Sequence, residues 1–240
     1  MTLVQILHLL ILIALVVALP LYDRVETRRL KTSADPRVRV RSYQKIVAYL
    51  WAMTIVLVAT LPFRQLVTAP RISAALTERA AGFSIPILIG LAAGLLLPVI
   101  LASRSPEERS KQLGPLRAIA FFLPRTREER AWFAAVCVSA GICEEVIFRG
   151  FLIRYLDALP LGLNLWGAVI ASAVIFGINH GYQGWKGVIV TSILALVFTA
   201  MFLLTGSLWI PIVIHALLDL RILVLLPPNS PEVFGPPSPG

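Results

Sequence analysis

Ionisable side chains interrupt three long apolar runs in the C-terminal half of this sequence. In chain order, they are Glu144, Glu145, Arg149, His180, His215 and Asp219. A charged or titratable group at membrane depth is costly and is by default a sign of function. Because lipid offers such groups no hydrogen-bond partner, we expect the three segments to bring them together around one water-filled cavity.

Spacing assigns different tasks to the two adjacent glutamates. Glu145 and Arg149 are four residues apart with the acid on the N-terminal side, so on a helix they form a pair that neutralises itself. Glu144 is rotated from Glu145 by about 100° around the helix and points toward a neighbouring helix. Glu144 is therefore the carboxylate that has no local partner.

The two histidines follow the same helical spacing. Phe176 precedes His180 by one turn, and His215 precedes Asp219 by one turn, so each pair shares a helix face. A carboxylate beside an imidazole is a general-base arrangement that activates water, and a second histidine can donate a hydrogen bond to an oxyanion. Together these groups suit hydrolysis of an amide without a nucleophilic side chain.

A metal site is the competing chemistry. Two histidines with one or two carboxylates match the ligand types of a hydrolytic zinc site, although the HExxH motif is absent. The zinc ligands would then be His180, His215 and either Glu144 or Asp219. The residue types favour hydrolysis and leave the question of a metal undecided.

Two further functions use the same residue types. A single His or Asp in a membrane helix is often interhelical glue, and a chain of carboxylates and histidines can relay protons in a proton-coupled transporter. A second carboxylate next to Glu145 argues against simple glue. The polar residues cluster in the last half of the chain and no inverted repeat is visible, which argues against a transporter.

The elements that must position these residues are membrane helices. Of the 240 residues, 58% are hydrophobic and 15% are charged, whereas about a quarter of a soluble domain is charged. Because a helix needs about 20 apolar residues to cross a bilayer, we predict an all-α, polytopic transmembrane helical bundle with about seven or eight spans. The seven apolar runs are Leu3 to Tyr22, Val47 to Leu66, Phe83 to Ala102, Ala131 to Leu156, Leu163 to Asn179, Gly187 to Leu204 and Leu208 to Leu226.

The formal net charge of +9 indicates membrane topology rather than nucleic-acid binding. Lysines and arginines crowd the segments between the first and second runs and between the third and fourth, and basic loops stay on the cytoplasmic side. We expect the N-terminus outside, a retained first helix rather than a cleaved signal peptide, and a multi-pass integral protein of the plasma (inner) membrane. Its partners are then the lipid bilayer and a membrane-associated peptide or protein.

The chain divides into three parts by composition. Residues 1–130 hold the N-terminal membrane spans with basic cytoplasmic loops, residues 131–226 hold the polar residues, and residues 227–240 form a proline-rich tail without fixed structure. The stretch Leu116 to Leu123 is either a segment in the membrane interface or an irregular cytoplasmic loop.

The polar residues resemble those of a known family, the CPBP intramembrane proteases, which include the CAAX prenyl endopeptidases. The family pattern has EExxxR on one helix, FxxxH on a later helix, and HxxxN or HxxxD near the end. In this sequence the motifs are Glu144-Glu145-x-x-x-Arg149, Phe176-x-x-x-His180 and His215-x-x-x-Asp219, in that order. The resemblance covers roughly residues 130 to 226, so that residues 131–226 become a CPBP-like catalytic core.

The resemblance implies an intramembrane endopeptidase. By it, Glu144 is the general base that acts on water with His180, while His215 and Asp219 bind the oxyanion or orient the water. No cofactor is favoured, because only two histidines are available and Glu144 is needed as the base; zinc stays the alternative. The implied catalytic residues are Glu144, Glu145, His180, His215 and Asp219, supported by Arg149 and Phe176.

Asp219 departs from part of the family pattern. The eukaryotic prenyl proteases carry Asn at this position, whereas bacterial relatives carry Asn or Asp. An aspartate changes the charge of the site, suits a metal slightly better, and accepts rather than donates a hydrogen bond unless it is protonated. The oxyanion role is therefore assigned more firmly to His215 than to Asp219.

The substrate and the depth of the site are less constrained. The family name implies a CAAX-type prenylated substrate, but no residue pattern indicates a prenyl pocket, and an inactive scaffold or immunity factor is a further alternative. Alternating spans put Glu144 near mid-membrane, His180 nearer the cytoplasm and His215 nearer the outside. Contact among them requires a tilted helix, a broken helix or a misplaced span boundary, and Gly177 and Gly181 to Gly184 favour a break at His180.

Overall fold

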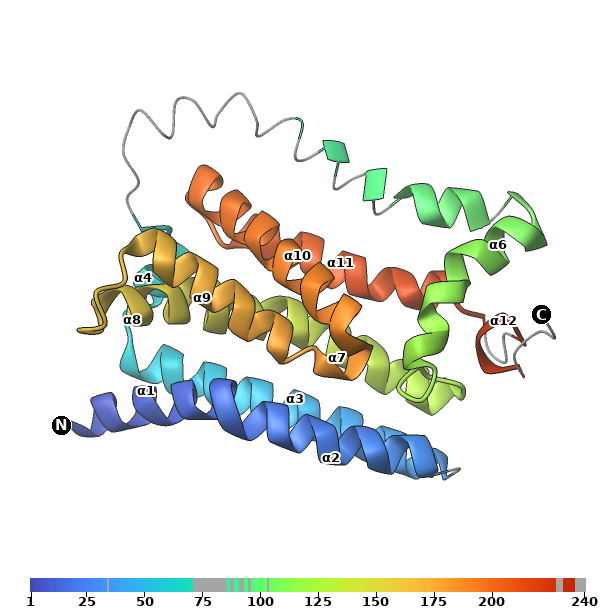
Figure 1. Cartoon of the computed structure of the whole chain (residues 1–240), viewed down its shortest axis with the longest axis horizontal. Coiled ribbons are helices and arrows are strands. Elements are labelled where there is room, and N and C mark those ends of the chain that lie inside the picture. Colours follow the sequence, from blue (N-terminus) through green and yellow to red (C-terminus); the bar gives the residue numbers. More distant parts are fainter. Residues whose placement is uncertain are drawn as a thin grey trace.

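The structure of the chain is a computed structural model that describes residues 1–33, 35–70, 86, 89–90, 93–94, 96–102, 104–227 and 231–235. The described residues form helices, and the β-pairing among them is limited to an isolated bridge between Thr68 and Ser207. The all-α prediction is confirmed. In Figure 1 the long helices run roughly alongside one another, with the N-terminus at one end of the bundle.

The first layer of the bundle contains, in order, α1 (Leu3–Ile13), the π-helical turn η1 (Ala14–Ala18), α2 (Leu19–Thr32) and α3 (Pro36–Thr60). The first three form one continuous helix of 30 residues, which begins with a capping box at Thr2. α3 begins after Asp35, whose side chain accepts from the Arg37 N–H, and lies beside that helix (Figure 1). The predicted end of the first run at Tyr22 is wrong, because the helix continues through polar residues to Thr32.

The central helix contains α7 (Arg127–Glu144), the π-helical segment η3 (Glu145–Leu152) and α8 (Ile153–Ala158). It begins with a second capping box, between Thr126 and Glu129. It is continuous for 32 residues, or about 48 Å, which exceeds the hydrocarbon thickness of about 30 Å. α7 packs against both α3 and α11, so the central helix forms the middle of the molecule.

The C-terminal helices are α9 (Leu165–Ile178), the 3₁₀ turn η4 (Gly181–Gln183), α10 (Gly184–Thr205), α11 (Trp209–Leu225) and α12 (Pro231–Phe234). α9 and α10 pack against each other as a hairpin. Gly184 has a φ of 79°, a conformation that glycine adopts without strain, and it allows the chain to reverse there. A Cβ at Gly177 would collide with Ser192, so glycine at this position allows α9 and α10 to approach closely.

Shorter elements close the two ends of the bundle: α4 (Phe63–Val67), α6 (Pro106–Leu113) and the 3₁₀ helix η2 (Gly114–Ile119). The predicted interfacial stretch Leu116 to Leu123 begins in η2 and ends in a turn. Its Phe122 ring packs edge-on against Tyr43, and Leu123 is fully buried. This stretch is therefore part 3₁₀ helix and part turn, it packs against the helices, and its position relative to the membrane interface stays a prediction.

The predicted number of seven or eight spans is not confirmed. Among the described residues, four helices are long and apolar enough to cross a membrane: Leu3–Thr32, Arg37–Thr60, Arg127–Ala158 and Gly181–Thr205. The fifth and seventh runs correspond to α9 and α11, which have 14 and 17 residues. At 1.5 Å per residue α9 is about 21 Å long, which is shorter than the hydrocarbon core. The third run, Phe83 to Ala102, lies partly outside the described residues.

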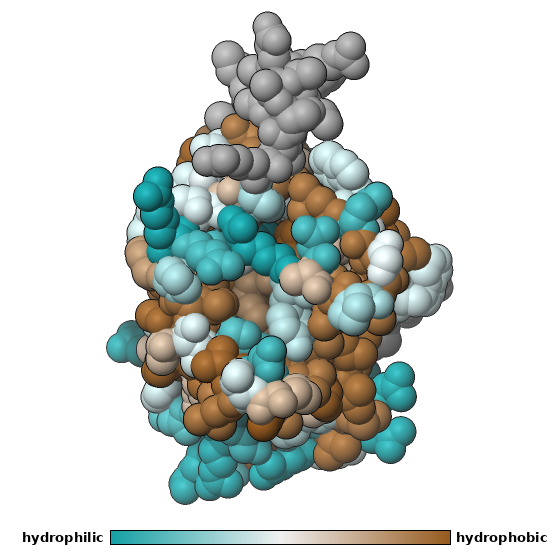
Figure 2. Space-filling model, turned by 90° about the vertical axis from the view of Figure 1, so that its left-hand side faces the viewer, coloured by the Kyte–Doolittle hydropathy of each residue, from teal (hydrophilic) through white to brown (hydrophobic). Residues whose placement is uncertain are grey.

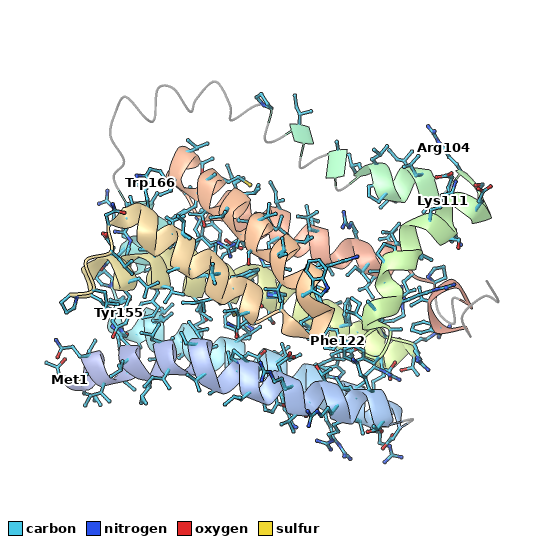
Figure 3. The ribbon with its side chains drawn as sticks, viewed as in Figure 1. Met1, Arg104, Lys111, Phe122, Tyr155 and Trp166 are labelled. Carbon is cyan, nitrogen blue, oxygen red and sulfur yellow. The ribbon has the colours of Figure 1, made fainter. Side chains whose placement is uncertain are left out.

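Polar side chains gather at the two ends of the bundle. Figure 3 shows Arg104 and Lys111 at the end opposite Met1 and Trp166. Figure 2 views the end that carries the N-terminus, where hydrophilic residues gather across the middle of the face and hydrophobic residues cover much of the rest. This separation of polar ends from apolar flanks is that of an integral membrane protein.

Some basic residues also hold the fold together. Arg39 is buried, and its Nε donates to the buried Glu129 carboxylate at 2.9 Å. Arg130 donates to the carbonyl oxygens of Leu223 and Leu226, which lie at the end of α11. The sequence interpretation, which explained the excess positive charge by topology alone, was therefore incomplete.

Candidate active site

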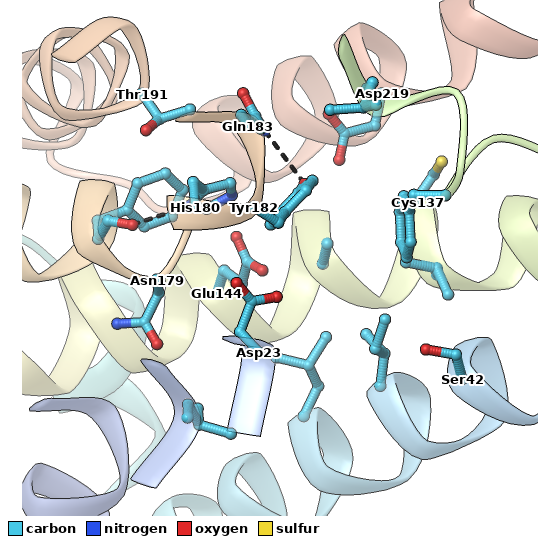
Figure 4. A pocket seen from close by; sticks show the side chains of 18 of the residues that line it. Asp23, Ser42, Cys137, Glu144, Asn179, His180, Tyr182, Gln183, Thr191 and Asp219 are labelled. Carbon is cyan, nitrogen blue, oxygen red and sulfur yellow. Dashed lines mark hydrogen bonds between the residues drawn. The ribbon is translucent and has the colours of Figure 1, made fainter. Parts of the chain in front are cut away.

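A cavity of about 330 Å³ lies inside the bundle. Its walls come from α2, α3, α7, α9, α10 and α11, with further contributions from η1, η3, η4 and the loop before α7. Figure 4 shows Glu144, His180 and Asp219 directed into it from α7, from the break after α9 and from α11. Five of the predicted site residues line it, and they are Glu144, Phe176, His180, His215 and Asp219. The expectation that polar residues of three segments converge on one cavity is confirmed for Glu144, His180, His215 and Asp219.

Glu145 lies behind the cavity wall as the centre of a buried network. Its side chain is 0% exposed, and its Oε1 accepts from Arg149 at 3.0 Å and from His215 Nδ1 at 2.8 Å. Arg149, 1% exposed, also donates to the Ala195 carbonyl oxygen. Because both partners are buried and mutually neutralising, Glu145 is held in place and is not available to a substrate.

The Arg149 guanidinium is enclosed by aromatic rings. Its central carbon lies 4.8 Å from the centroid of the Phe176 ring and 5.4 Å from that of Phe198. A cation over an aromatic face is attracted by the ring quadrupole, and more strongly where water is excluded. Phe176 therefore supports the site by holding the cation that anchors Glu145.

His215 connects the buried network to the cavity. A carboxylate only accepts hydrogen bonds, so the 2.8 Å contact with Glu145 requires a proton on His215 Nδ1. On the other side of the ring, Nε2 lies 3.9 Å from Glu144 Oε2 and 3.6 Å from Asp219 Oδ2. The ring also stacks on Phe198, with centroids 5.1 Å apart. One imidazole thus meets three carboxylates, with a fixed orientation.

Glu145 is bound through Oε1 while its Oε2 lacks a hydrogen-bond partner, and Glu144 makes no described hydrogen bond through Oε2. Its Oε2 is buried, and no described residue hydrogen-bonds to it. The carboxylate lines the cavity, with 17% of the side chain exposed. The spacing argument, which paired Glu145 with Arg149 and left Glu144 unpartnered, therefore describes the geometry correctly.

His180 enters the cavity from a break between two helices. It follows the end of α9 and caps η4. Its Nδ1 lies 2.8 Å from the Phe176 carbonyl oxygen, which can only accept, so Nδ1 carries the proton and Nε2 keeps a lone pair. The ring lies over Phe176, with centroids 4.5 Å apart. Nε2 is therefore the ring atom that can accept a proton from water.

This break removes the difficulty of depth that alternating spans raised. α9 has only 14 residues, so it ends partway across the bundle and leaves His180 beside the same cavity as Glu144 and His215. The glycines expected to favour a break at His180 do flank it in η4 and at the start of α10. The predicted site residues of different segments can therefore meet without a misplaced span boundary.

Two local features bring α11 against the central helix. A Cβ at Gly141 would lie 2.7 Å from Ala216 Cβ and 2.8 Å from Ala216 N, so only glycine allows this approach of α7 and α11. The π-helical segment begins at Glu145, and such segments occur frequently at functional sites. The result is that His215 reaches Glu145 and still faces Glu144.

Sequence reasoning missed the N-terminal wall of the cavity. Asp23 and Glu26 from α2, Tyr49 from α3, and Asn179 and Tyr182 from the α9–α10 break all line it. The acids of α2 were assigned to a loop because the apolar run stops at Tyr22. A usable signal was present, since the lining residues of this helix share one face at helical spacing: Leu19, Tyr22, Asp23, Glu26 and Leu30.

The metal question can be compared with the arrangement of donor atoms. Among the described residues, no group of three or more His, Cys, Asp and Glu side chains is arranged to hold a metal ion. Nδ1 of His215 contacts Glu145 and Nδ1 of His180 contacts a backbone carbonyl, so Nε2 is the atom through which either ring could bind a metal. These ring orientations are compatible with the zinc alternative of His180, His215 and Glu144 or Asp219.

Comparison with protein families gives a match to the C-terminal part of the chain. Residues 126–221 match the family described as type II CAAX prenyl endopeptidase, Rce1-like. This segment is less than half of the chain, and it contains all three motifs. The resemblance to the CPBP and CAAX proteases is confirmed for it. No curated protein and no solved structure gives a significant match.

Proposed function

We propose that this integral membrane protein, whose residues 126–221 match the CAAX prenyl endopeptidases, is an intramembrane endopeptidase that uses water activated by Glu144 and His180. The observation that carries the proposal is the different environment of the two glutamates. Glu145 lies behind the cavity wall and binds Arg149 and His215 through Oε1, although its buried Oε2 has no hydrogen-bond partner, whereas Glu144 lines the cavity and its Oε2 hydrogen-bonds to no described residue. A free carboxylate beside an imidazole lone pair is what general-base activation of water requires.

The reaction begins with a water molecule between Glu144 and His180. Glu144 takes one proton, with Nε2 of His180 accepting a hydrogen bond from the same water, and the water oxygen attacks the carbonyl carbon of the peptide bond. The C=O electron pair moves to the oxygen, which becomes an oxyanion. When the tetrahedral intermediate collapses, the C–N bond breaks and the proton held by Glu144 passes to the leaving amine.

His215 is the donor that we assign to the oxyanion. With Nδ1 donating to Glu145, a doubly protonated ring presents Nε2–H to the cavity, where no described group lies closer than 3.6 Å to accept it. A preorganised donor of this kind typically contributes a factor of about 100 to 1,000 in kcat. Asp219, whose side chain is 40% exposed, favours the charged ring and orients water at the rim of the cavity.

The substrate is a membrane-associated peptide or protein, and the membrane is the plasma (inner) membrane. The family supports a substrate of the CAAX type. The orientation with basic segments in the cytoplasm places residues 24–45 and 104–130 on that side. Several helices then cross the membrane. The cavity lies between α2 and α3 on one side and the helices of residues 126–221 on the other.

The test is cleavage of membrane-anchored fluorogenic peptides by protein reconstituted in liposomes. Glu144→Gln and His180→Ala should each lower kcat by about 100-fold or more, while both proteins remain folded in the membrane. Glu107→Gln is the matched control, because Glu107 is an exposed acid far from the cavity. Wild-type turnover by the Glu144→Gln protein would exclude the assigned base.

Elemental analysis of the same preparation addresses zinc. Stoichiometric zinc with chelator-sensitive cleavage would make His180, His215 and a carboxylate ligands rather than a water-activating set. Cleavage that persists after chelation would support the roles given above. Failure of the wild-type protein to cut any peptide of a broad panel would favour the scaffold alternative, and substrate-dependent proton flux would favour a transporter.

A further inference from the structure

The cavity is acidic although the chain is basic. Among the described residues that line it are four carboxylates and no lysine or arginine. The chain as a whole carries 22 Lys and Arg against 13 Asp and Glu. Two of the four carboxylates, Glu144 and Asp219, belong to the site already described, but Asp23 and Glu26 come from α2, outside the segment that matches the protease family.

Asp23 and Glu26 face the reaction site from the opposite wall. They are three residues apart on one face of α2. In the view of Figure 4, Asp23 and Asp219 lie on opposite sides of Glu144. The neighbouring walls are apolar, with Leu30 and Ile46 among their residues.

Glu26 is the unsatisfied member of this wall. It is 6% exposed, and its Oε1 is buried without a hydrogen-bond partner. It forms ion pairs with Lys45 Nζ at 3.7 Å and with an Arg29 nitrogen at 3.9 Å, but neither cation is close enough for a hydrogen bond. Their side chains are 47% exposed, so each can turn toward water. A buried carboxylate in this state gains most from a donor that enters the cavity with a ligand.

We propose that Asp23 and Glu26 bind a lysine or arginine side chain of the substrate, so that the protein cleaves peptides with a cation within a few residues of the scissile bond. The inference rests on the proposed peptidase function. Membrane proteins carry an excess of Lys and Arg in the segments next to their cytoplasmic membrane boundary, and α2 reaches the basic end of this bundle. A juxtamembrane basic segment therefore has the charge and the location that this wall fits.

The same charge distribution disfavours a free C-terminal carboxylate in the cavity. Such a group would meet four carboxylates and no lysine or arginine among the described lining residues. Like charges at close range in a site that excludes water repel each other strongly. The α2 side of the cavity therefore favours a basic side chain of the substrate over an acidic one.

The experiment compares peptides that differ in one charge. Membrane-anchored fluorogenic peptides carry either Lys or Gln at each of three positions on both sides of the scissile bond, and kcat/KM is measured in liposomes. The wild-type protein should prefer Lys at one or more positions by at least tenfold. The Asp23→Asn/Glu26→Gln double variant should reduce this ratio to less than twofold, mainly by lowering kcat/KM for the Lys peptide.

Two further variants and a binding measurement separate the possible failures. Glu107→Gln should keep the wild-type preference, and Asp23→Lys should reverse it in favour of Glu peptides. Fluorescence anisotropy with the His180→Ala protein, which keeps all four carboxylates, measures Lys and Gln peptide binding without cleavage. Cleavage without a Lys preference would overturn this inference and leave the peptidase function intact. Preferential binding of Lys peptides without any cleavage by the wild-type protein would support Lys binding at this wall and overturn the peptidase function.

Discussion

Replacing both members of the buried ion pair should cost the fold much less than replacing one. Glu145 and Arg149 are 0% and 1% exposed and lie 3.0 Å apart. Removing one partner of a buried pair leaves an uncompensated charge and costs about 3–5 kcal/mol, whereas replacing both by apolar residues is often neutral. We therefore expect about 3–5 kcal/mol of destabilisation from Arg149→Met and the same from Glu145→Leu.

The double variant should be the more stable of the three. It removes both charges, so the remaining cost comes mainly from His215 Nδ1, which loses its acceptor. An unsatisfied buried donor costs about 1–3 kcal/mol. Additive single losses would give about 6–10 kcal/mol, so a double loss of about 1–3 kcal/mol corresponds to a coupling energy of at least about 3 kcal/mol between the two side chains.

Unfolding by SDS in mixed micelles gives the three free energies. Cys137 and Cys143 are free and buried, so their reaction with a thiol-specific dye reports unfolding. Peptidase activity should stay absent in the double variant even where stability returns, because His215 is no longer oriented by Glu145. Additive losses of unfolding free energy, or an Arg149→Met protein as stable as wild type, would refute the description of Glu145 as a carboxylate held in place by Arg149.

Two other predictions concern the placement of the reacting groups. Asp219→Asn should keep at least about a tenth of the wild-type kcat, because the amide keeps the hydrogen-bonding shape and 40% of the Asp219 side chain is exposed; complete loss of activity together with loss of bound zinc would favour the metal alternative instead. Gly141→Ala should lower kcat by about 100-fold, because the new Cβ would collide with Ala216 and push α11, which carries His215, away from α7. Gly114→Ala is the matched control, since nothing lies within 4 Å of a Cβ there, and equal activities in the two alanine variants would contradict the packing argument.

Relations within one helix could be predicted from the sequence. The pair of Glu145 and Arg149 follows from a spacing of four, and the structure contains it. Convergence of three segments was also predictable in kind, because polar groups in lipid must find one another. The partner of His215 was not predictable, since it depends on how closely α11 approaches α7, which a contact between Gly141 and Ala216 determines.

The predicted number of spans is not confirmed, and the N-terminal wall of the cavity was not predicted, for a different physical reason. Hydropathy counts apolar residues, whereas a span requires helical length, and α9 ends after 14 residues although its apolar run is longer. At the first run the opposite happens. The helix continues beyond Tyr22, because the polar residues of α2 face the cavity and the loop side rather than lipid.

The residues that line the cavity come from two different parts of the chain, and only one of these parts matches the protease family. The carboxylates and histidines that we assign to bond cleavage all lie in residues 126–221, the segment that matches the protease family. The wall facing them is supplied by α2 and α3, which lie outside that segment. Chemistry at the peptide bond and selection of the peptide therefore depend on different parts of the sequence. The family match supports a CAAX-type substrate, and we propose that the acidic residues of α2, which lie outside the matched segment, add a preference for a basic side chain near the scissile bond.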